Sequence, residues 1–442
     1  MKLSPFDNLP PLTKEEAFLI LETPLQDLKL SSDYYKAIYH LSRYPSFETE
    51  EVLIKFIKLL SSDISIKIAK RKAVEVLGKF GCERAIPLIA SNLRSSDPFL
   101  VENSAWSLQE LRCNNSHIHK EIGSLLNDKN QNRRALIQSL SKMNAISEVP
   151  IIRNLLEEPN IKPGIKGSSI AALYNLNNEK TLISKLADYL SLPNQNDRQC
   201  AVQDIIDSEA ISLLPIVIKA PISPAFKFNA ISSLYSNIDS KININHIFQL
   251  IETVIIDSPL NINLLNNYES DCSLDYLINL LMNPDFSKGY ASLVQLIDRM
   301  PDDVINSLLV SWDKLTNDYG AIYFLTILLR LIKVEDPNAI IKVKKMLFKC
   351  LGSYWPQFMK FRPSAILCLS KIDPINCNNY ISSWLNEKDT PSWTARYATL
   401  MILEKYNNHE QILFQNNIKS CNEDTNIFVR AKAKSLLNKS IV

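Results

Sequence analysis

Small and apolar residues recur at helical spacing along this chain, and three stretches share one register. They are AKRKAVEVLGKF from Ala69, LVENSAWSLQEL from Leu100 and NRRALIQSLSKM from Asn132. Aligned as windows of twelve, each has a small or apolar residue at places 1, 5, 9 and 12, and the windows start 31 and 32 residues apart. A fixed period of this length is typical of stacked helix pairs, in which each repeat buries its apolar side on its neighbours.

The same template extends in both directions along the chain. DYYKAIYHLSRY from Asp33 fits it upstream, and windows from Ile165, Arg198 and Phe226 continue it downstream. The segments between the windows predict the outer helix of each pair, with prolines in their first turns, where proline costs little: Pro87, Pro150 and Pro215. Only 8 glycines argue against a turn-rich β protein. The predicted fold class is therefore all-α, a solenoid of stacked antiparallel helix pairs with a concave inner groove.

The register is lost between residues 238 and 271. INHIFQLIETVII predicts a helix there, but the asparagine-rich SPLNINLLNNYESD that follows has no helical period. We therefore expect an N-terminal repeat arm over 1–237, an irregular linker region over 238–271 and a C-terminal helical repeat arm over 272–442. In the C-terminal arm, GAIYFLTILLRLI from Gly320 is apolar on nearly all sides, and we expect it to be the most enclosed helix.

The register also gives each side chain a direction. Places 1, 5, 9 and 12 fall within one arc of about 80° and must face neighbouring helices, so places 3 and 7 point the opposite way, with place 4 beside them. If the second helix of each pair lines the inner wall, these places form one concave patch. The patch combines a tryptophan with charged and tyrosine side chains: Tyr35, Tyr39, Arg71, Glu75, Glu102, Asn103, Trp106, Arg134 and Gln138. A large aromatic residue on the side away from the core indicates a partner.

These residues also have a purely structural interpretation. Trp106 is either a stacking platform for a ligand or a wedge against the next inner helix, and the sequence weighs the two about equally. Glu75 and Glu102 either supply a proton or are solvated surface carboxylates, which is the commoner case for a single glutamate. Arg71 and Arg134 either bind carboxylates of a ligand or pair with glutamates across the groove.

Charge and composition narrow the function classes. The chain has 49 Lys+Arg and 47 Asp+Glu, a formal charge of +2, so no strong field for nucleic acid follows. It contains no apolar run of membrane-spanning length, no leader-type start and no C-x-x-C pair among its 8 cysteines, which favours a cytoplasmic protein. Cys113, His117 and His119 lack a metal-binding arrangement, so no metal site is expected. Phosphate-binding glycine loops and hydrolase elbow motifs are also absent from the sequence.

Four of the repeat segments resemble the E/F-type phycobilin lyases, HEAT-like repeat proteins that attach linear tetrapyrroles to phycobiliprotein cysteines. The segments are DYYKAIYHL from Asp33, RKAVEVLGKFGC from Arg71, DPFLVENSAWSLQEL from Asp97 and QNRRALIQSL from Gln131. The opening FDNLPPLTKEEA from Phe6 resembles the start of the phycoerythrobilin lyase subgroup that acts on phycoerythrin α subunits. The likeness is specific over roughly the first 145 residues and looser beyond them. It implies that the solenoid is of the HEAT-like, armadillo-type kind.

The resemblance also implies a reaction that suits the concave patch. A phycobilin has two propionates, a conjugated π-system and an ethylidene on ring A, to which the acceptor cysteine sulfur adds to give a thioether. On this hypothesis Glu102 or Glu75 protonates a ring nitrogen. Arg71 and Arg134 bind the propionates. The aromatic and amide side chains contact the rings: Trp106, Tyr35, Tyr39, Asn103 and Gln138. No cofactor is expected, because the bilin is the substrate.

The expected function is attachment of phycoerythrobilin to a cysteine of a phycoerythrin subunit, with α favoured, and without isomerisation, because no separate isomerase motif is visible. The expected partners are the phycoerythrin apo-subunit, phycoerythrobilin and, in a heterodimer, a second HEAT-repeat lyase subunit; no nucleic acid or membrane is expected. Three alternatives stay open. The chain is a lyase-isomerase that makes phycourobilin, a non-enzymatic adaptor or chaperone for phycobiliprotein assembly or turnover, or a generic HEAT scaffold, which leaves Trp106 unexplained.

Overall fold

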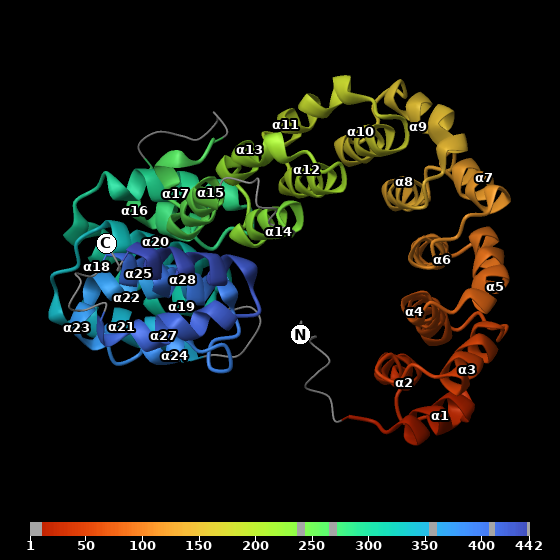
Figure 1. Cartoon of the computed structure of the whole chain (residues 1–442), viewed down its shortest axis with the longest axis horizontal. Helices are drawn as coiled ribbons and strands as arrows, with labels where there is room; N and C mark the ends of the chain where they lie inside the picture. The colour runs from red at the N-terminus through yellow and green to blue at the C-terminus, as the bar shows by residue number, and fades with distance from the viewer. Residues whose placement is uncertain (1–10, 237–243, 265–271, 353–359, 406–411, 440–442) are drawn as a thin grey trace. The chain divides into compact units, whose positions relative to one another are not determined.

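The computed structural model describes residues 11–236, 244–264, 272–352, 360–405 and 412–439 (Figure 1). All regular elements in these ranges are helices, so the predicted all-α fold is confirmed. The chain divides into two compact units, residues 1–186 (the N-terminal unit) and residues 187–442 (the C-terminal unit). None of the described helices combines the length and the apolar character that crossing a membrane requires.

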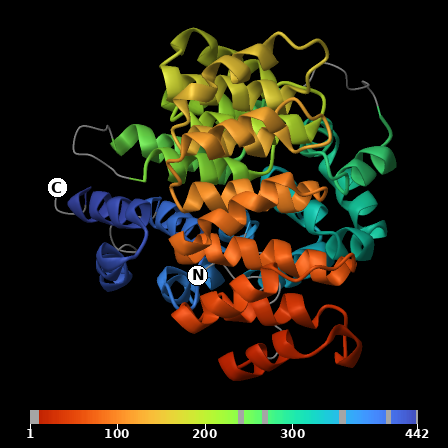
Figure 2. The same ribbon diagram turned by 90° about the vertical axis from the view of Figure 1, so that its right-hand side faces the viewer.

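The N-terminal unit is a row of helix pairs. In order, its helices are α1 (Lys14–Glu22), α2 (Asp33–Leu41), α3 (Phe47–Ile57), α4 (Ile64–Phe80), α5 (Ile86–Ser91), α6 (Pro98–Glu110), α7 (Ser116–Leu125), α8 (Arg133–Lys142), α9 (Val149–Leu156) and α10 (Pro163–Asn177). Each odd-numbered helix packs on the helix that follows it, and the even-numbered helices pack on one another in order. Figure 1 shows the even-numbered helices on the concave side of this row, and Figure 2 shows the row stacked upward from α1. The second helix of each pair therefore lines the inner side, as predicted.

Local sequence signals set where these helices begin. Thr13 Oγ1 accepts a hydrogen bond from Glu16 N (3.1 Å) and a Glu16 carboxylate oxygen accepts one from Thr13 N (2.8 Å), which forms a capping box. Asp97 caps α6, and Pro98 occupies its first position, where a missing N–H leaves no helical bond unmade. The three prolines predicted in first turns are found there: Pro87 in α5, Pro150 in α9 and Pro215 in α13 (Leu214–Lys219).

The core of the N-terminal unit is built from the template places that were expected to face neighbouring helices. Places 5 and 9 are buried in all three windows: Ala73, Leu77, Ser104, Leu108, Leu136 and Leu140. α4 and α6 approach most closely at Gly78, where an added Cβ would lie 2.8 Å from Ser107 Cα. Ser107 Oγ also donates a hydrogen bond to Val74 O (2.9 Å), so the offset between these two inner helices is fixed at this point.

The C-terminal unit begins within α11 (Leu186–Tyr189). The helices that follow are α12 (Gln195–Asp207), α13, α14 (Pro224–Leu234), α15 (Ile244–Ile256), α16 (Leu274–Leu280), α17 (Phe286–Ile297), α18 (Pro301–Val310), α19 (Trp312–Asn317), α20 (Tyr319–Leu331), α21 (Pro337–Gly352), α22 (Arg362–Ile372), α23 (Pro374–Cys377), α24 (Ile381–Leu385), α25 (Trp393–Glu404), α27 (Gln415–Ser420) and α28 (Ile427–Lys439). The windows predicted from Arg198 and Phe226 fall largely within α12 and α14, so these periodic segments are also helices.

This second unit folds back on itself. α15 packs against α22, α25 and α28, which follow it much later in the chain. The rings of Phe248 on α15 and Tyr397 on α25 meet edge to face, with centroids 6.2 Å apart, and Lys432 Nζ on α28 lies 2.7 Å from Glu252 Oε1 on α15. Helices that would be an open inner face in a simple row are therefore covered within the C-terminal unit.

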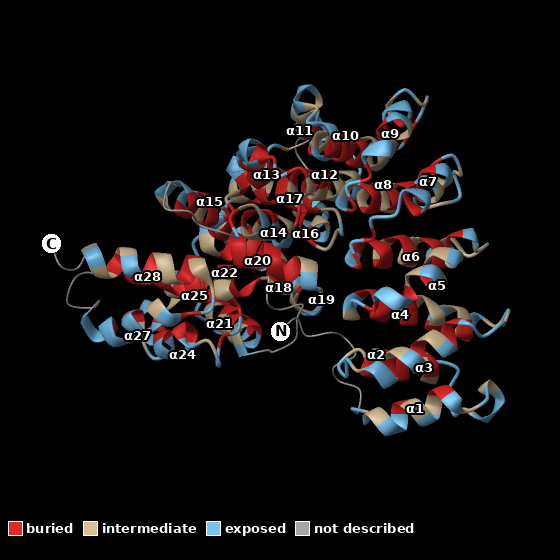
Figure 3. Cartoon of the chain, turned by 45° about the vertical axis from the view of Figure 1, so that its right-hand side comes forward, coloured by how far each residue is buried: buried red, intermediate tan, exposed pale blue. Residues whose placement is uncertain are grey.

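Burial follows this closure. α20 is buried without interruption from Ala321 to Leu329, as expected for the GAIYFLTILLRLI segment. α25 is buried without interruption from Thr394 to Leu403, so α20 is not the most enclosed helix, contrary to the prediction. The sequence of α25 contains threonines and an arginine, which masked its burial. Figure 3 shows both helices almost entirely in the colour of buried residues.

The expected linker over 238–271 coincides only in part with described residues. Its predicted helix is α15, and a short 3-10 turn follows at Pro259–Asn261. Residues 238–243 and 265–271 of the linker, like residues 1–10 of the N-terminal arm, lie outside the described residues. The contacts divide the chain between Leu186 and Ala187. The division into arms over 1–237 and 272–442 stays a prediction.

Candidate functional site

The nine predicted site residues lie on four consecutive inner helices of the N-terminal unit, and all nine are half-buried. The residues by helix are Tyr35 and Tyr39 on α2, Arg71 and Glu75 on α4, Glu102, Asn103 and Trp106 on α6, and Arg134 and Gln138 on α8. α2 packs on α4, α4 on α6 and α6 on α8. The register therefore placed these side chains correctly between core and solvent, and Trp106 is not sealed between helices.

The centre of this surface is a charged cluster on α4. Lys72 Nζ lies 2.9 Å and Lys79 Nζ 2.6 Å from Glu75 Oε1. Burial alone would raise the pKa of the Glu75 carboxyl, but hydrogen bonds and positive charge from Lys79 and Lys72 outweigh it, so the net pKa is lowered. Glu75 is therefore held as a carboxylate. Burial raises the pKa of the Tyr35 phenol, and the charge of Glu75 adds to this, which links α2 to the cluster.

The two lysines connect the cluster to aromatic rings on both neighbouring helices. Lys72 Nζ lies 5.6 Å from the centre of the Tyr39 ring on α2, and Lys79 Nζ lies 5.9 Å from the Trp106 ring on α6. Both distances are within the range of cation–π attraction. The three charged side chains of α4 thus lie between two aromatic rings on the neighbouring inner helices. The order is Tyr39, Lys72, Glu75, Lys79 and Trp106.

α6 contributes polar groups that the fold does not use. Neither Glu102 nor Asn103 has a hydrogen bond or ion pair with a described residue, although both side chains are half-buried. Trp106 has the contact with Lys79 and no hydrogen bond from its indole N–H within the described ranges. The carboxyl of Glu102, the amide of Asn103 and the indole N–H of Trp106 lie on one half-buried stripe of α6 and are available to a ligand. This is the composition expected of a binding surface.

Arg71 is not available to a ligand, because its guanidinium is paired with Asp97. Its Nε and Nη2 donate to the two oxygens of Asp97 (2.8 and 3.0 Å), and its guanidinium lies 4.6 Å from the Phe99 ring centre. Asp97 also caps α6 by accepting a hydrogen bond from Phe99 N (3.1 Å). A bidentate pair of this kind anchors α4 to the start of α6. The sequence interpretation had offered Glu75 or Glu102 as the structural partner of Arg71, and the structure gives Asp97 instead.

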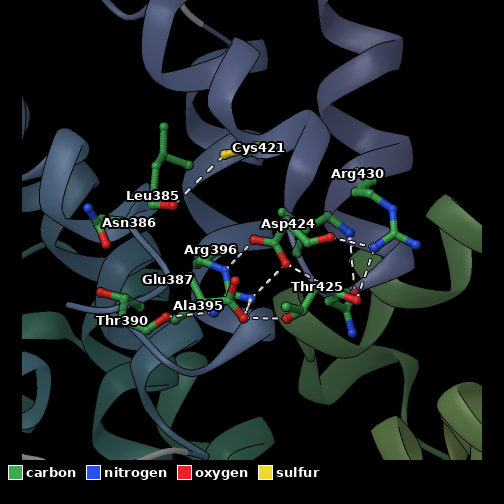
Figure 4. A network of polar contacts seen from close by, with 12 residues as sticks. Leu385, Asn386, Glu387, Thr390, Ala395, Arg396, Cys421, Asp424, Thr425 and Arg430 are labelled. Atoms are coloured by element: carbon green, nitrogen blue, oxygen red, sulfur yellow. Dashed lines mark hydrogen bonds and ion pairs between the residues drawn. The ribbon is translucent and has the colours of Figure 1, made fainter.

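The same type of bond recurs in the C-terminal unit. Arg396 Nε and Nη2 donate to Asp424 (2.6 and 2.8 Å), while Arg396 Nη1 donates to Thr390 O (2.7 Å) (Figure 4). Arg198 likewise pairs with Asp285, the N-cap of α17. An arginine that joins one inner helix to the start of another is thus a repeated structural device, and Arg71 is one example of it.

α8 carries the remaining predicted residues. Arg134 Nη1 donates to Gly164 O (2.6 Å) at the start of α10, so part of its guanidinium is used between repeats. The neighbouring Arg133 pairs with Glu158 (2.6 Å). Gln138 is half-buried one turn after Arg134. α6 lies between α8 and α4 in the row of inner helices, so Arg134 and Gln138 extend the surface beyond the α4 cluster.

Lys79 is the residue that the sequence interpretation missed. It occupies place 11 of the α4 window, one turn after Glu75. At 100° per residue, place 11 falls between places 7 and 4, on the inner side. The register therefore predicts that Lys79 lies on the inner side, but the sequence interpretation considered no place beyond 7 on that side.

The Cys113, His117 and His119 segment has a structural role. His119 is buried, and its Nε2 lies 2.9 Å from Cys113 O. In the described part of the chain, no three His, Cys, Asp or Glu side chains are grouped so that they could hold a metal ion.

Comparison with known proteins assigns the chain to a family. Residues 69–95, which include the α4 cluster, match the model of the PBS lyase HEAT-like repeat. Over 410 residues the chain is 34% identical to the bilin biosynthesis protein CpeY of Synechococcus sp. (strain WH8020), covering 92% of this chain and 97% of that protein. The chain belongs to the E/F-type phycobilin lyase family. It is thus a HEAT-like repeat protein of the bilin-protein lyase class, as the resemblance implied.

Two further similarities extend along the chain. It is 26% identical over 398 residues to the uncharacterized phycocyanin operon protein Y of Pseudanabaena tenuis (strain PCC 7409), covering 89% of this chain and 92% of that protein. Among solved structures, the complex of CpcE and CpcF of phycocyanin lyase from Nostoc sp. PCC7120 aligns at 22% identity with a TM-score of 0.48, over 57% of this chain and 99% of that chain.

Proposed function

We propose that this lyase attaches phycoerythrobilin through a thioether to a cysteine of a phycoerythrin subunit, with the α subunit as acceptor and without isomerising the bilin. The resemblance of the opening residues to the phycoerythrobilin subgroup supports the choice of bilin and acceptor. The observation that carries the proposal is the half-buried stripe on α6, where Glu102, Asn103 and Trp106 make no hydrogen bond within the described part of the chain.

In this proposal the bilin lies along the inner helices with a ring stacked on Trp106. Tyr35 and Tyr39 offer further aromatic faces, and the Arg134 guanidinium, whose Nη1 donates to Gly164 O, binds one propionate. Asn103 and Gln138 would hydrogen-bond the pyrrole edges. Holding the bilin in one orientation removes a bimolecular penalty and fixes the face to which sulfur adds.

The reaction is an addition, so it needs no oxidant and no leaving group. The acceptor sulfur forms a bond to the ethylidene carbon, the electron pair of the exocyclic double bond moves into the ring system, and a proton restores charge balance. Glu102 is the proton donor that we favour, since Glu75 is ion-paired to two lysines and its pKa is lowered. No cofactor is needed, because the bilin itself is the substrate.

Separating binding from chemistry tests these roles. Trp106→Ala should weaken the absorbance change on phycoerythrobilin binding, whereas Glu102→Gln should keep binding and slow thioether formation by about 10²–10⁴-fold, the usual contribution of a positioned proton donor. Glu157→Gln, an exposed glutamate at the end of α9, is the matched control. If both site variants attach the bilin at the wild-type rate, the α6 stripe is not the site.

The acceptor is identified in the same system. The chain is co-expressed with phycoerythrobilin synthesis and with separate phycoerythrin α and β subunits, and the coloured peptide is mapped by mass spectrometry. We expect the bilin on α, with the absorbance of thioether-linked phycoerythrobilin and not that of phycourobilin. Phycourobilin on the peptide would indicate a lyase-isomerase, colour only after a second repeat protein is added would indicate a heterodimer, and binding of phycoerythrin without bilin would indicate an adaptor.

A further inference from the structure

The α4 cluster has more positive than negative charge in direct contact. Two ammonium groups, Lys72 and Lys79, share the single carboxylate of Glu75. None of the three has another ion pair within the described ranges. A second anion bound here would be attracted to an ammonium group whose charge the Glu75 carboxylate neutralises only in part.

The two lysines differ in how firmly they are held. The Lys72 side chain is 11% exposed and lies against the Tyr39 ring, whereas the Lys79 side chain is 50% exposed. The Glu75–Lys79 pair joins residues four apart on a helix surface, and such exposed pairs contribute little because water and salt screen them. Lys79 can therefore leave Glu75 at small cost, while Lys72 stays and keeps that carboxylate paired.

Lys79 is also next to the ring that a flat ligand would cover. Its Nζ lies 5.9 Å from the centre of the Trp106 ring. A carboxylate on a short flexible arm of a ligand stacked at Trp106 would meet this ammonium group. Arg71, the sequence-based candidate for that task, already has both carboxylate oxygens of Asp97 on its guanidinium.

We propose that Lys79 binds a propionate of the bilin by exchanging its Glu75 partner for the ligand carboxylate, with Lys72 retaining Glu75. This rests on the proposed function, since it names one contact of the bilin that the inner face is proposed to hold. Lys79 is then a binding residue that selects for a free carboxylate. Arg71 is assigned to the structural bond between α4 and α6.

The test compares phycoerythrobilin with its dimethyl ester, which has the same rings and no carboxylates. Kd values for both are measured by absorbance titration of the full chain, for the wild type, Lys79→Met and Lys79→Arg, with Lys120→Met on outer helix α7 as the control. Met keeps the aliphatic stem, and Arg keeps the charge. We expect Lys79→Met to weaken binding of the free acid about tenfold, as the loss of one charge-assisted bond would. Binding of the ester should not change, and Lys79→Arg should restore the preference for the free acid.

The outcomes separate this assignment from the function on which it rests. If Lys79→Met binds the free acid like the wild type, or weakens free acid and ester equally, Lys79 does not bind a propionate, although the bilin site stands. If the wild type develops no bound-bilin spectrum with either form, the proposed function fails and this assignment fails with it. Circular dichroism of each variant checks that the total helix content is unchanged.

Discussion

The two units of this chain are made of similar helices, yet the described inner helices are covered to different extents within each unit. In the N-terminal unit, the residues at places 3 and 7 of α4 and α6 are half-buried, and two side chains of α6, Glu102 and Asn103, have no polar partner among the described residues. In the C-terminal unit, α15 covers α22, α25 and α28, and α25 is buried along nearly its whole length. An open row of helices presents a surface, whereas a closed one is a core.

The charged clusters show the same difference. In the C-terminal unit, Lys227 Nζ lies 3.1 Å from Asp257 Oδ1, the Tyr290 hydroxyl donates to Asp257 Oδ2 (2.5 Å), and Tyr323 donates to the same oxygen; all four side chains are buried. The two charges there are paired and out of reach of solvent, so removing either partner would leave an uncompensated buried charge. The α4 cluster uses the same kinds of group at half exposure. Exposure, more than residue type, therefore separates the site from the structural clusters.

The largest expected effect comes from breaking an ion pair in the closed unit. Asp424→Asn removes the buried charged partner of the Arg396 guanidinium, leaves it with the partly exposed Glu387 at 3.6 Å, and should lower the free energy of unfolding of the C-terminal unit by up to about 3–5 kcal/mol. Asp97→Asn removes the corresponding partner of Arg71 in the open unit, where both side chains are partly exposed, and should cost about 1 kcal/mol or less. Urea unfolding followed by hydrogen exchange at α25 and at α4 measures both. Equal losses would contradict the distinction between open and closed units.

An intermediate effect is expected where α4 and α6 touch. In Gly78→Ala the new Cβ would lie 2.8 Å from backbone and side-chain atoms of Ser107, so α6 must shift at the residue next to Trp106. Overpacking of this kind costs about 1–3 kcal/mol, partly offset by the better helix propensity of alanine. We expect bilin binding to weaken as well, because Trp106 moves relative to Lys79.

The matched control for that change lies in the closed unit. Gly289→Ala would place a Cβ 2.3 Å from the Phe324 ring. It should destabilise the C-terminal unit while bilin affinity, measured by absorbance titration, stays at the wild-type value. A loss of bilin binding in Gly289→Ala equal to that in Gly78→Ala would mean that the closed unit also contacts the bilin.

The sequence predicted the elements well because their signals are local. The prolines in the first turns of outer helices and the period of the inner helices each involve residues within one or two turns, and both were confirmed. The partner of Arg71 could not be found in the same way, since Asp97 is 26 residues away and only packing brings them together. The closure of the C-terminal unit by α15 was missed for the same reason. The roles of the site residues toward a bilin stay predictions.

The smallest effect, and the one that separates the two glutamates, is expected from Glu75→Gln. Because the lysines lower the pKa of Glu75 in the folded protein, its contribution to stability is complete above the pKa of an unfolded glutamate, about 4.3, and is lost as the pH falls through the lower folded value. The variant should therefore lose about 0.3–1 kcal/mol of unfolding free energy at neutral pH, as exposed pairs do. In urea unfolding between about pH 3 and 7, its unfolding free energy should fall less steeply as the pH is lowered.

If Lys79 must leave Glu75 to bind a propionate, the Glu75→Gln variant should also bind free-acid bilin as tightly as the wild type or a few-fold more tightly, with an unchanged rate of thioether formation. A large loss of that rate, with binding intact, would make Glu75 the proton donor and would return Glu102 to the status of a surface carboxylate.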